Sequence, residues 1–219
     1  MRKGKRHVCV IGLGFFGAGL ARALSKNSEV LAIDNSLPRV NDISDHVQRA
    51  LAIDVKDFNA ISAVISDDTD EAIVSIGEDL EASILCTLYL KRLGVPYIRA
   101  KASSDEHAEI LRSIGADHVI FPEVETAQRV ALKIINPNLM DLITLSEGYC
   151  ISDLTSPSHF TGETLADLHI RNKYNVLVIA IKKNKDTIDT FLPPPDYIIK
   201  QGDILEVLGK KEDVLSICE

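Results

Sequence analysis

Tryptophan is absent from this 219-residue chain, and aromatic residues make up only 5% of it. Long apolar runs are missing too, since no stretch approaches the ~18 to 20 apolar residues that cross a bilayer. Positive charge is scarce, with 24 Lys and Arg against 32 Asp and Glu and a net charge of -8. Because phosphate backbones select basic surfaces, this deficit argues against a nucleic-acid partner. We expect a soluble, cytoplasmic protein that could still dock on a membrane protein.

Cysteine and histidine are too scattered to build a disulfide framework or a metal centre. The four cysteines lie far apart without a CxxC pair, and the six histidines show no ligand spacing. Cys9 and Cys86 fall within apolar patterns, where a free cysteine usually behaves as a small buried hydrophobe. We therefore predict neither a disulfide nor a zinc site.

The most informative segment covers residues 7 to 34, HVCVIGLGFFGAGLARALSKNSEVLAID. It predicts a strand, a glycine-rich turn, a helix and a second strand that ends in an acid. Gly12 permits the tight turn, Gly14 leaves the backbone open to a phosphate, and Gly17 lets the helix pack close to the strand. The positive N-terminal end of the helix would face the anion. The alternative is a glycine-rich turn without a ligand.

Asp34 ends the second strand at about the ~20-residue distance at which dinucleotide-binding folds place a ribose-binding acid. Its carboxylate can accept hydrogen bonds from both ribose hydroxyls. The same charge would repel a 2′-phosphate, so the pocket should prefer NAD or adenosine nucleotides to NADP.

Strands and helices continue to alternate beyond Asp34. Further strands are expected at 49–54, 71–76, 97–101 and 118–121, and helices at 59–65, 80–93, 104–114 and 125–135. Short apolar strands that alternate with helices predict an α/β fold, a Rossmann-like doubly wound parallel sheet with both faces covered.

The pattern changes near residues 136 to 142, and we place the domain boundary there, at 1–137 and 138–219. Beyond it the expected strands are 143–145, 149–154, 176–181, 187–192 and 204–208. Only two short helices fit, at 164–169 and 212–217, and residues 155–160 read as a loop. This predicts a smaller α+β domain.

Several motifs beyond the glycine turn point to one family. The most specific are residues 75–83 (SIGEDLEAS), 111–117 (LRSIGAD), Pro122-Glu123 and the C-terminal runs 165–168, 178–181 and 202–205. With these motifs the chain resembles the TrkA/KtrA-type RCK (KTN) regulatory subunits of Trk and Ktr potassium-uptake systems, and the resemblance covers nearly its whole length.

The resemblance implies a non-enzymatic subunit that gates a membrane potassium channel or transporter. Family members form dimers through the first domain and assemble into rings, typically octameric, beneath a TrkH- or KtrB-like potassium-translocating subunit. The protein would then be cytoplasmic and peripheral at the inner face of the membrane. ATP, ADP or NAD(H) occupies the glycine-rich pocket in the family, and a divalent cation can accompany ATP.

The resemblance also implies roles for individual residues. The phosphate loop would be Gly12, Leu13, Gly14, Phe15, Phe16 and Gly17; the ribose site Asp34 with Asn35; the adenine site Asp54 and Val55; and the opposite side of the crevice Ile76, Gly77 and Glu78. Lys101 would face the phosphates, and Glu123 would lie near a cation bound with ATP. From the residues alone, Asp54 could instead start a helix, and Lys101 and Glu123 could be solvated strand ends.

Phe15 departs from the family pattern. Many Ktr-type members have arginine at this position, in a GRFG pattern, where it can reach a phosphate across the dimer. Phenylalanine removes that cation and leaves open which nucleotide acts on this protein. The Phe15-Phe16 pair could belong to the core or meet a dimer partner.

Two other functions remain open at this stage. An NAD-dependent oxidoreductase would need a catalytic acid or base in the second domain, which offers His159 and His169 but no recognisable constellation. A sensor could instead bind its main ligand, such as a cyclic dinucleotide, in the C-terminal domain, as some relatives do.

Overall fold

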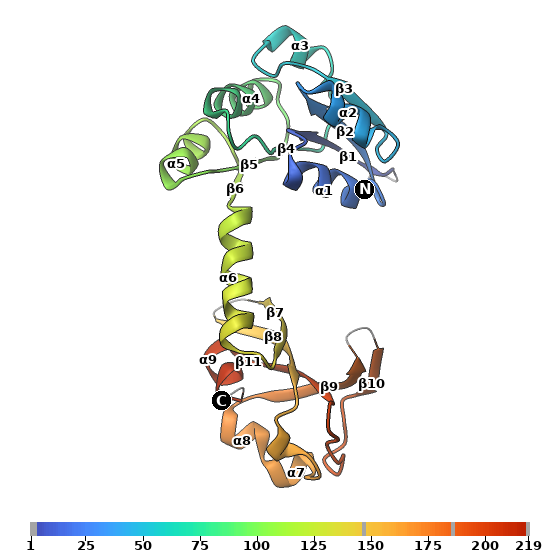
Figure 1. Cartoon of the computed structure of the whole chain (residues 1–219). Helices are drawn as coiled ribbons and strands as arrows, with labels where there is room; N and C mark the ends of the chain where they lie inside the picture. Colours follow the sequence, from blue (N-terminus) through green and yellow to red (C-terminus); the bar gives the residue numbers. More distant parts are fainter. Residues whose placement is uncertain (1–3, 146–147, 185–186, 218–219) are drawn as a thin grey trace. The chain divides into compact units, whose positions relative to one another are not determined.

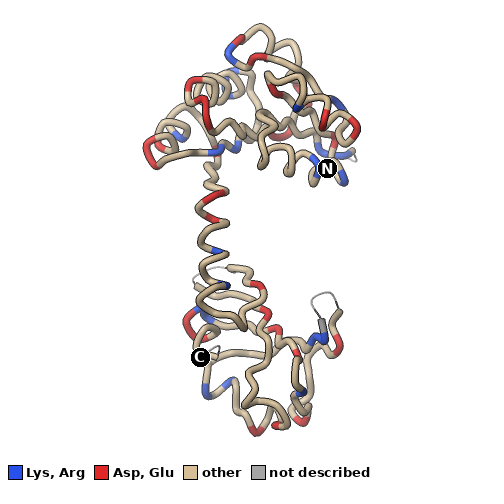
Figure 2. Tube along the Cα trace, viewed as in Figure 1, with Lys and Arg blue, Asp and Glu red and all other residues tan. Residues whose placement is uncertain are grey.

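The computed structural model describes residues 4–145, 148–184 and 187–217. The chain divides into two compact units, Met1–Val124 and Glu125–Glu219. Each unit has its own sheet (Figure 1). Charges of both signs are spread along both units, as Figure 2 shows, so the described residues of neither unit contain a long run of one sign.

Unit 1 is built from alternating strands and helices. In chain order they are β1 (Arg6–Ile11), α1 (Phe15–Leu24), β2 (Ser28–Asp34), α2 (Leu37–Ser44), β3 (Arg49–Ala52), α3 (Phe58–Ser62), β4 (Glu71–Val74), α4 (Leu80–Arg92), β5 (Ile98–Lys101), α5 (Asp105–Ser113) and β6 (His118–Ile120), followed by α6 (Pro122–Ile135). Helix α2 was not expected from the sequence, and β3 and β4 end two residues earlier than expected.

The sheet of unit 1 is entirely parallel, with strand order β3-β2-β1-β4-β5-β6. Strand order reverses direction between β1 and β4, where Cys9 pairs with Leu31 on one side and Ala72 on the other. Such a reversal opens a crevice at the carboxyl ends of the two strands. The predicted doubly wound fold is confirmed.

Alternate residues of the central strands enter separate cores on the two faces of this sheet. Val8 and Val10 of β1 pack in a cluster with Ala21 of α1 and Ile43 of α2. Cys9 and Ile11 instead join a cluster that contains residues of α3, α4 and α5. Because both faces are covered by helices, the strands are apolar on both sides.

Unit 2 contains an antiparallel sheet with strand order β10-β9-β11-β8-β7. Its elements are β7 (Leu139–Thr144), β8 (Tyr149–Thr155), a 3₁₀ turn (Ser158–Phe160), α7 (Leu165–Leu168), α8 (Ile170–Tyr174), β9 (Leu177–Asn184), β10 (Thr187–Phe191), β11 (Ile204–Lys210) and α9 (Lys211–Ser216). The α+β class is confirmed. The expectation of only two short helices was wrong, because α8 follows α7 after His169 adopts a left-handed conformation, and the expected 155–160 loop contains the 3₁₀ turn.

The division between the units falls inside α6. The sequence placed the boundary at 1–137 and 138–219, where the helix ends, whereas division by contacts places Glu125 and the residues after it in unit 2. Leu132 of α6 packs against the core of unit 2, so most of the helix belongs to that unit.

Burial of the cysteines follows the sequence expectation. Cys9 and Cys86 are buried free thiols in unit 1, and Cys150 is buried in unit 2; Cys218 lies outside the described residues. Burial raises the pKa of the Cys86 thiol to about 12, so it stays protonated and inert near neutral pH. Among the described residues, no helix combines the length and apolarity needed to cross a membrane.

Candidate functional site

A pocket of ≈ 590 Å³ opens at the carboxyl edge of the parallel sheet, where the strand order reverses. Its floor and walls come from residues at or just after the carboxyl ends of β1, β2, β3, β4, β5 and β6. The volume falls within the range of small-molecule and cofactor sites, ~300 to 1,000 Å³.

The glycine-rich turn forms one wall of this pocket. Gly12 has a φ of +88°, and a Cβ there would lie 2.9 Å from the backbone of Ser75. A Cβ on Gly17 would lie 1.9 Å from the carbonyl oxygen of Gly12, so α1 approaches β1 more closely than any side chain allows. Nothing lies within 4 Å of the Cβ position of Gly14, which leaves this backbone open. The three positions thus have the geometry that the sequence predicted.

Helix α1 begins directly at this turn and has no side-chain cap. Its N-cap is Gly14, and its first turn carries no acidic residue. The amide groups of the first turn and the positive end of the helix are therefore free to meet an anion.

Asp34 links the loop after β1 to the loop after β2 in the pocket wall. Its side chain is buried, with the residue only 5% exposed. Oδ2 accepts a hydrogen bond of 2.6 Å from the amide of Leu13, and Oδ1 accepts one of 2.8 Å from the amide of Ser36. The carboxylate is thus held in place by two loops before any ligand arrives. Arg39 is its charged neighbour, with Nη1 3.6 Å from Oδ2.

The segment after β3 lines the side of the pocket next to Asp34. Ile53, Asp54 and Val55 lie there, and Oδ1 of Asp54 accepts a hydrogen bond of 3.0 Å from the amide of Lys56. Asp57, rather than Asp54, caps α3 by accepting from the amides of Asn59 and Ala60. The alternative role of Asp54 as a helix start is therefore wrong.

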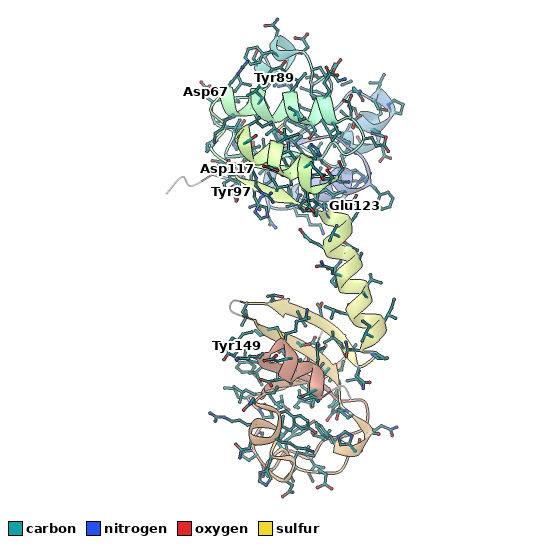
Figure 3. All side chains as sticks on the ribbon, turned by 90° about the vertical axis from the view of Figure 1, so that its left-hand side faces the viewer. Asp67, Tyr89, Tyr97, Asp117, Glu123 and Tyr149 are labelled. Atoms are coloured by element: carbon teal, nitrogen blue, oxygen red, sulfur yellow. The ribbon has the colours of Figure 1, made fainter. Side chains whose placement is uncertain are left out.

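Lys101 and Glu123 face each other on the opposite side. The ammonium of Lys101, at the end of β5, forms an ion pair of 2.5 Å with Oε1 of Glu123. Glu123 lies at the start of α6 (Figure 3). This contact lowers the pKa of the Glu123 carboxyl below its usual value. A Cβ on Gly77 would lie 3.3 Å from Nζ of Lys101, so the missing side chain at Gly77 leaves room for the ammonium.

Lys56, which follows β3, forms ion pairs with two acids at the start of α4. Lys56 contacts Asp79 at 2.9 Å and Glu81 at 2.7 Å. Asp79 also caps α4 by accepting a hydrogen bond of 3.0 Å from the amide of Ala82, and this bond and Lys56 lower the pKa of its carboxyl. Lys56 is therefore already neutralised by two acids.

The two aromatic residues of the loop differ in environment. Phe15 is fully exposed, which excludes the core role that the sequence left open, whereas Phe16 is half-buried. Both line the pocket. A fully exposed phenylalanine at the edge of a pocket is free to contact a ligand or a second protein.

Most of the predicted site residues meet in this single pocket. The lining includes Gly12, Gly14, Phe15, Phe16, Asp34, Asn35, Asp54, Val55, Ile76, Gly77, Glu78, Lys101 and Glu123. Leu13 and Gly17 are not part of the lining, because the Leu13 side chain is buried beneath the loop and Gly17 packs against Gly12. The residues missed by the sequence analysis are Ile11, Ser36, Arg39, Ile53, Lys56, Ser75, Asp79 and Ala82. Most of them lie within a few residues of a strand end, which is the signal that could have found them.

The charge of the lining is negative. Five carboxylates but only three cationic side chains border the pocket. Among the described residues, no group of three or more His, Cys, Asp and Glu side chains could hold a metal ion alone.

A smaller hollow, of ≈ 330 Å³, lies in unit 2. It is lined by residues of α7, α8 and β9 and by Pro193 and Pro195, with Arg171 as its cation. His169 in its wall and Asn175 beside it have positive φ values of 47° and 53°. Such strained backbone is concentrated at ligand sites and switch regions.

Fold and pocket together define a two-domain protein with a Rossmann-like first domain and a ligand-sized crevice at its switch point. The TrkA-N domain family matches residues 8–122, and the TrkA-C domain family matches residues 151–219. The chain therefore belongs to the TrkA family of Trk and Ktr potassium-uptake regulatory proteins.

Full-length relatives support this assignment. The chain is 39% identical to the Ktr system potassium uptake protein C of Bacillus subtilis over 96% of its own length and 95% of the relative. It is 32% identical to the Ktr system potassium uptake protein A of the same organism, over 95% and 94%.

Solved structures share the fold. The GsuK RCK domain matches the whole chain with a TM-score of 0.62 at 17% identity, and the GsuK channel bound to NAD matches it with a TM-score of 0.61 at 16% identity. The chain spans 48% and 40% of these longer chains.

Proposed function

We propose that this protein is a cytoplasmic, non-enzymatic regulatory subunit that binds an adenine nucleotide in the pocket of unit 1. The bound nucleotide controls a membrane potassium-translocating subunit of the KtrB or TrkH type. The observation that carries the proposal is the pocket at the sheet's switch point, with an uncapped helix start on one side and the fixed carboxylate of Asp34 on the other.

In this proposal the nucleotide spans the pocket. Its phosphates meet the amides after Gly12, its ribose donates to Asp34, and its adenine lies against Val55. Lys101 exchanges its partner Glu123 for a phosphate oxygen. A nucleotide that binds one of the subunit's two conformations more tightly shifts the subunit toward that conformation, and this shift provides the regulation. The coupling free energy is typically about 1 to 3 kcal/mol per pair of sites.

The kind of nucleotide follows from charge. The negative lining and the uncharged Phe15 do little to neutralise the charge of a triphosphate. ATP therefore requires a bound cation more than ADP or NAD(H), which carry less negative charge. Glu123 can supply one carboxylate to a divalent cation whose other ligands are phosphate oxygens and water, the usual arrangement for magnesium. Magnesium should then strengthen ATP binding to the wild type and have a smaller effect on Glu123→Gln.

Helix α6 supports assembly with further copies of this chain. None of its residues is buried, and Val130, Ile134 and Ile135 expose apolar side chains. An exposed apolar helix face of this kind normally meets a protein partner. We propose a dimer as the building block of a ring, typically octameric, beneath the membrane subunit.

A second candidate function is ligand sensing through unit 2. The hollow beside Arg171, with two left-handed residues at or beside its wall, supports it. A cyclic dinucleotide has the aromatic bases and anionic phosphates that such a site would accept. The two candidates predict opposite results for two variants of the full chain, since Asp34→Asn should weaken the response in one case and Arg171→Ala in the other.

The main experiment measures ligand-induced thermal shifts with ATP, ADP, AMP, NAD+ and NADH, together with native mass. We expect stabilisation by at least one of these nucleotides, a homo-oligomeric particle, and control of potassium flux when the protein is reconstituted with its membrane subunit. Absence of any adenine-nucleotide shift would contradict the pocket's proposed role. Hydride transfer to a substrate panel would instead support an oxidoreductase.

A further inference from the structure

Arg39 is a cationic residue of the pocket that the glycine motif does not predict. It lies in the first turn of α2 and lines the pocket. Its Nη1 atom is 3.6 Å from Oδ2 of Asp34, and its side chain is 56% exposed. The guanidinium therefore lies beside the proposed ribose site and in contact with solvent.

The donors of this guanidinium have no hydrogen-bond partner among the described residues. No side-chain hydrogen bond from Arg39 is found there, and 3.6 Å is too long for one. Arg22 offers a contrast on the same half of the unit, because it bonds Oδ2 of Asp42 at 2.6 Å and the Asp42 carbonyl at 3.4 Å. Arg39 thus does not serve as a tight structural ion pair.

Asp34 does not depend on Arg39 for its position. The amides of Leu13 and Ser36 already hold its two oxygens at 2.6 and 2.8 Å. A ligand can therefore displace Arg39 from the carboxylate without releasing the carboxylate itself. The guanidinium then keeps all its donors and its flat cationic face for the ligand.

We infer that Arg39 is a specificity-determining residue for the adenosine half of the nucleotide, an inference that rests on the proposed nucleotide function. Its plane stacks on the adenine or donates to the ribose oxygens, since it projects from the β2 side of the switch point. Lys101, at the end of β5, lies on the other side. Arginine is the cation best suited to an aromatic ring.

The same position sets how strongly the pocket discriminates against a 2′-phosphate. Asp34 repels that group, but Arg39 attracts it from a neighbouring site. The preference for NAD over NADP is therefore smaller than Asp34 alone would produce. Removal of Arg39 should widen that preference.

The test uses the full chain and isothermal titration with AMP, ADP, ATP, NAD+ and NADP+. Arg39→Ala should lower affinity for AMP, ADP, ATP and NAD+ by a similar factor, roughly three- to thirtyfold. The loss for NADP+ should be larger. Arg39→Lys should fall between wild type and Arg39→Ala, and Arg22→Ala should stay within about twofold of wild type. Thermal unfolding without ligand should be alike for all four proteins.

Three results would overturn the inference. Affinities of Arg39→Ala that match the wild type show that Arg39 does not contact the nucleotide. A loss that grows from AMP to ADP to ATP places Arg39 at the phosphates instead of the adenosine. An unchanged or narrower preference for NAD over NADP removes its role in specificity. Failure of the wild type to bind any adenine nucleotide is a different result, because it refutes the proposed function and this inference together.

Discussion

The amide of Leu13 donates a 2.6 Å hydrogen bond to the carboxylate of Asp34, twenty-one residues away along the chain. This bond ties the glycine-rich loop after β1 to the end of β2. Leu13 itself is buried, so the loop is anchored by a side chain below and by a carboxylate beside it. The proposed phosphate and ribose sites are consequently fixed relative to each other.

Asp34→Asn tests this anchoring. An amide has one acceptor oxygen where the carboxylate has two, so the amide of either Leu13 or Ser36 loses its partner. An unsatisfied buried group costs about 1 to 3 kcal/mol of the free energy of unfolding. The ribose also loses one acceptor, and a hydrogen bond of about 1 to 3 kcal/mol lost from the bound state lowers nucleotide affinity roughly five- to 150-fold. Isothermal titration checks the loss. Asp42→Asn, an exposed acid paired with Arg22, serves as the matched control and should bind like the wild type; equal affinities for all three proteins would contradict the role of Asp34.

Gly17→Ala tests the close contact between α1 and β1. The new methyl would lie 1.9 Å from the carbonyl oxygen of Gly12, so the helix must shift. We expect a loss of about 2 to 4 kcal/mol in the free energy of unfolding. Gly19, on the same helix, is exposed and has nothing within 4 Å of its Cβ position. Gly19→Ala should stabilise the protein by about 0.5 to 1 kcal/mol in the same urea titration. If Gly17→Ala and Gly19→Ala had similar effects on the free energy of unfolding, the contact between α1 and β1 would not be tight.

Phe15→Arg tests the charge of the phosphate loop. A cation at this fully exposed position should favour ligands with more phosphates, while the pocket's other residues stay unchanged. We expect the ratio of ATP to ADP affinity to rise about three- to tenfold at low salt and to fall again as salt is added. Phe15→Leu adds no charge and should leave the ratio as it is. An ATP-to-ADP affinity ratio that stays the same in Phe15→Arg would show that residue 15 does not lie near the phosphates.

Lys182→Met tests a buried charge cluster in unit 2. Nζ of Lys182 lies 3.0 Å from Asp153 and 3.0 Å from Glu206. Burial alone would lower the pKa of Lys182, but these two acids outweigh it and raise the pKa. Loss of the ammonium leaves two partly buried carboxylates side by side, at an expected cost of about 2 to 4 kcal/mol.

The neighbouring residue supplies the control for that change. Lys183 pairs with Asp189 at 2.7 Å, but its side chain is 61% exposed. Lys183→Met should cost less than about 1 kcal/mol. Chemical unfolding at pH 7 compares the free energies of unfolding of the two variants. Equal losses of stability would mean that the burial of Lys182 does not increase the contribution of its ion pairs.

His107 should make the stability of unit 1 depend on pH. The residue is 3% exposed, Nδ1 accepts from the amide of Ser103 at 3.3 Å, and Nε2 has no partner among the described residues. Burial lowers the pKa of His107 below its usual 6.5. Below pH 6.5 the unfolded chain takes up a proton that the folded one does not, so the free energy of unfolding falls as the pH falls. The slope from this group is at most about 1.4 kcal/mol per pH unit.

Urea unfolding of wild type and His107→Gln between pH 8 and pH 5 measures this contribution. The variant should show a shallower fall below pH 6.5, whatever its stability at pH 8. His118→Gln, at an exposed position, should keep the wild-type slope. If the free energy of unfolding fell equally with pH in wild type and His107→Gln, His107 would not be the cause of the pH dependence.

The first half of the fold was predictable because its signals are local. Gly12, Gly17 and Asp34 each occupy a position that only their residue type suits, and the apolar strands alternate with helices at regular intervals. Helix α2 escaped prediction because it has only three apolar residues in eight, although Pro38 in its first turn is a typical start signal.

The pocket was predictable only in part. Residues at strand ends, such as Lys101, could be placed because parallel strands finish at one edge. Arg39 could not be placed, because its long side chain reaches back from the first turn of α2 toward Asp34 and no spacing rule encodes that reach. The helix after β6 was expected at 125–135 but begins at Pro122, since proline suits the first helical position as well as a break.

The first five helices of unit 1 begin in two ways. Asp57, Asp79 and Ser104 cap α3, α4 and α5 with their side chains, whereas α1 and α2 have no side-chain cap hydrogen bond in the described chain. A nucleotide would complete the missing end of α1 with its own oxygens. The ligand would thereby take the place of a helix cap, and in the nucleotide-free protein the start of α1 would lack that cap.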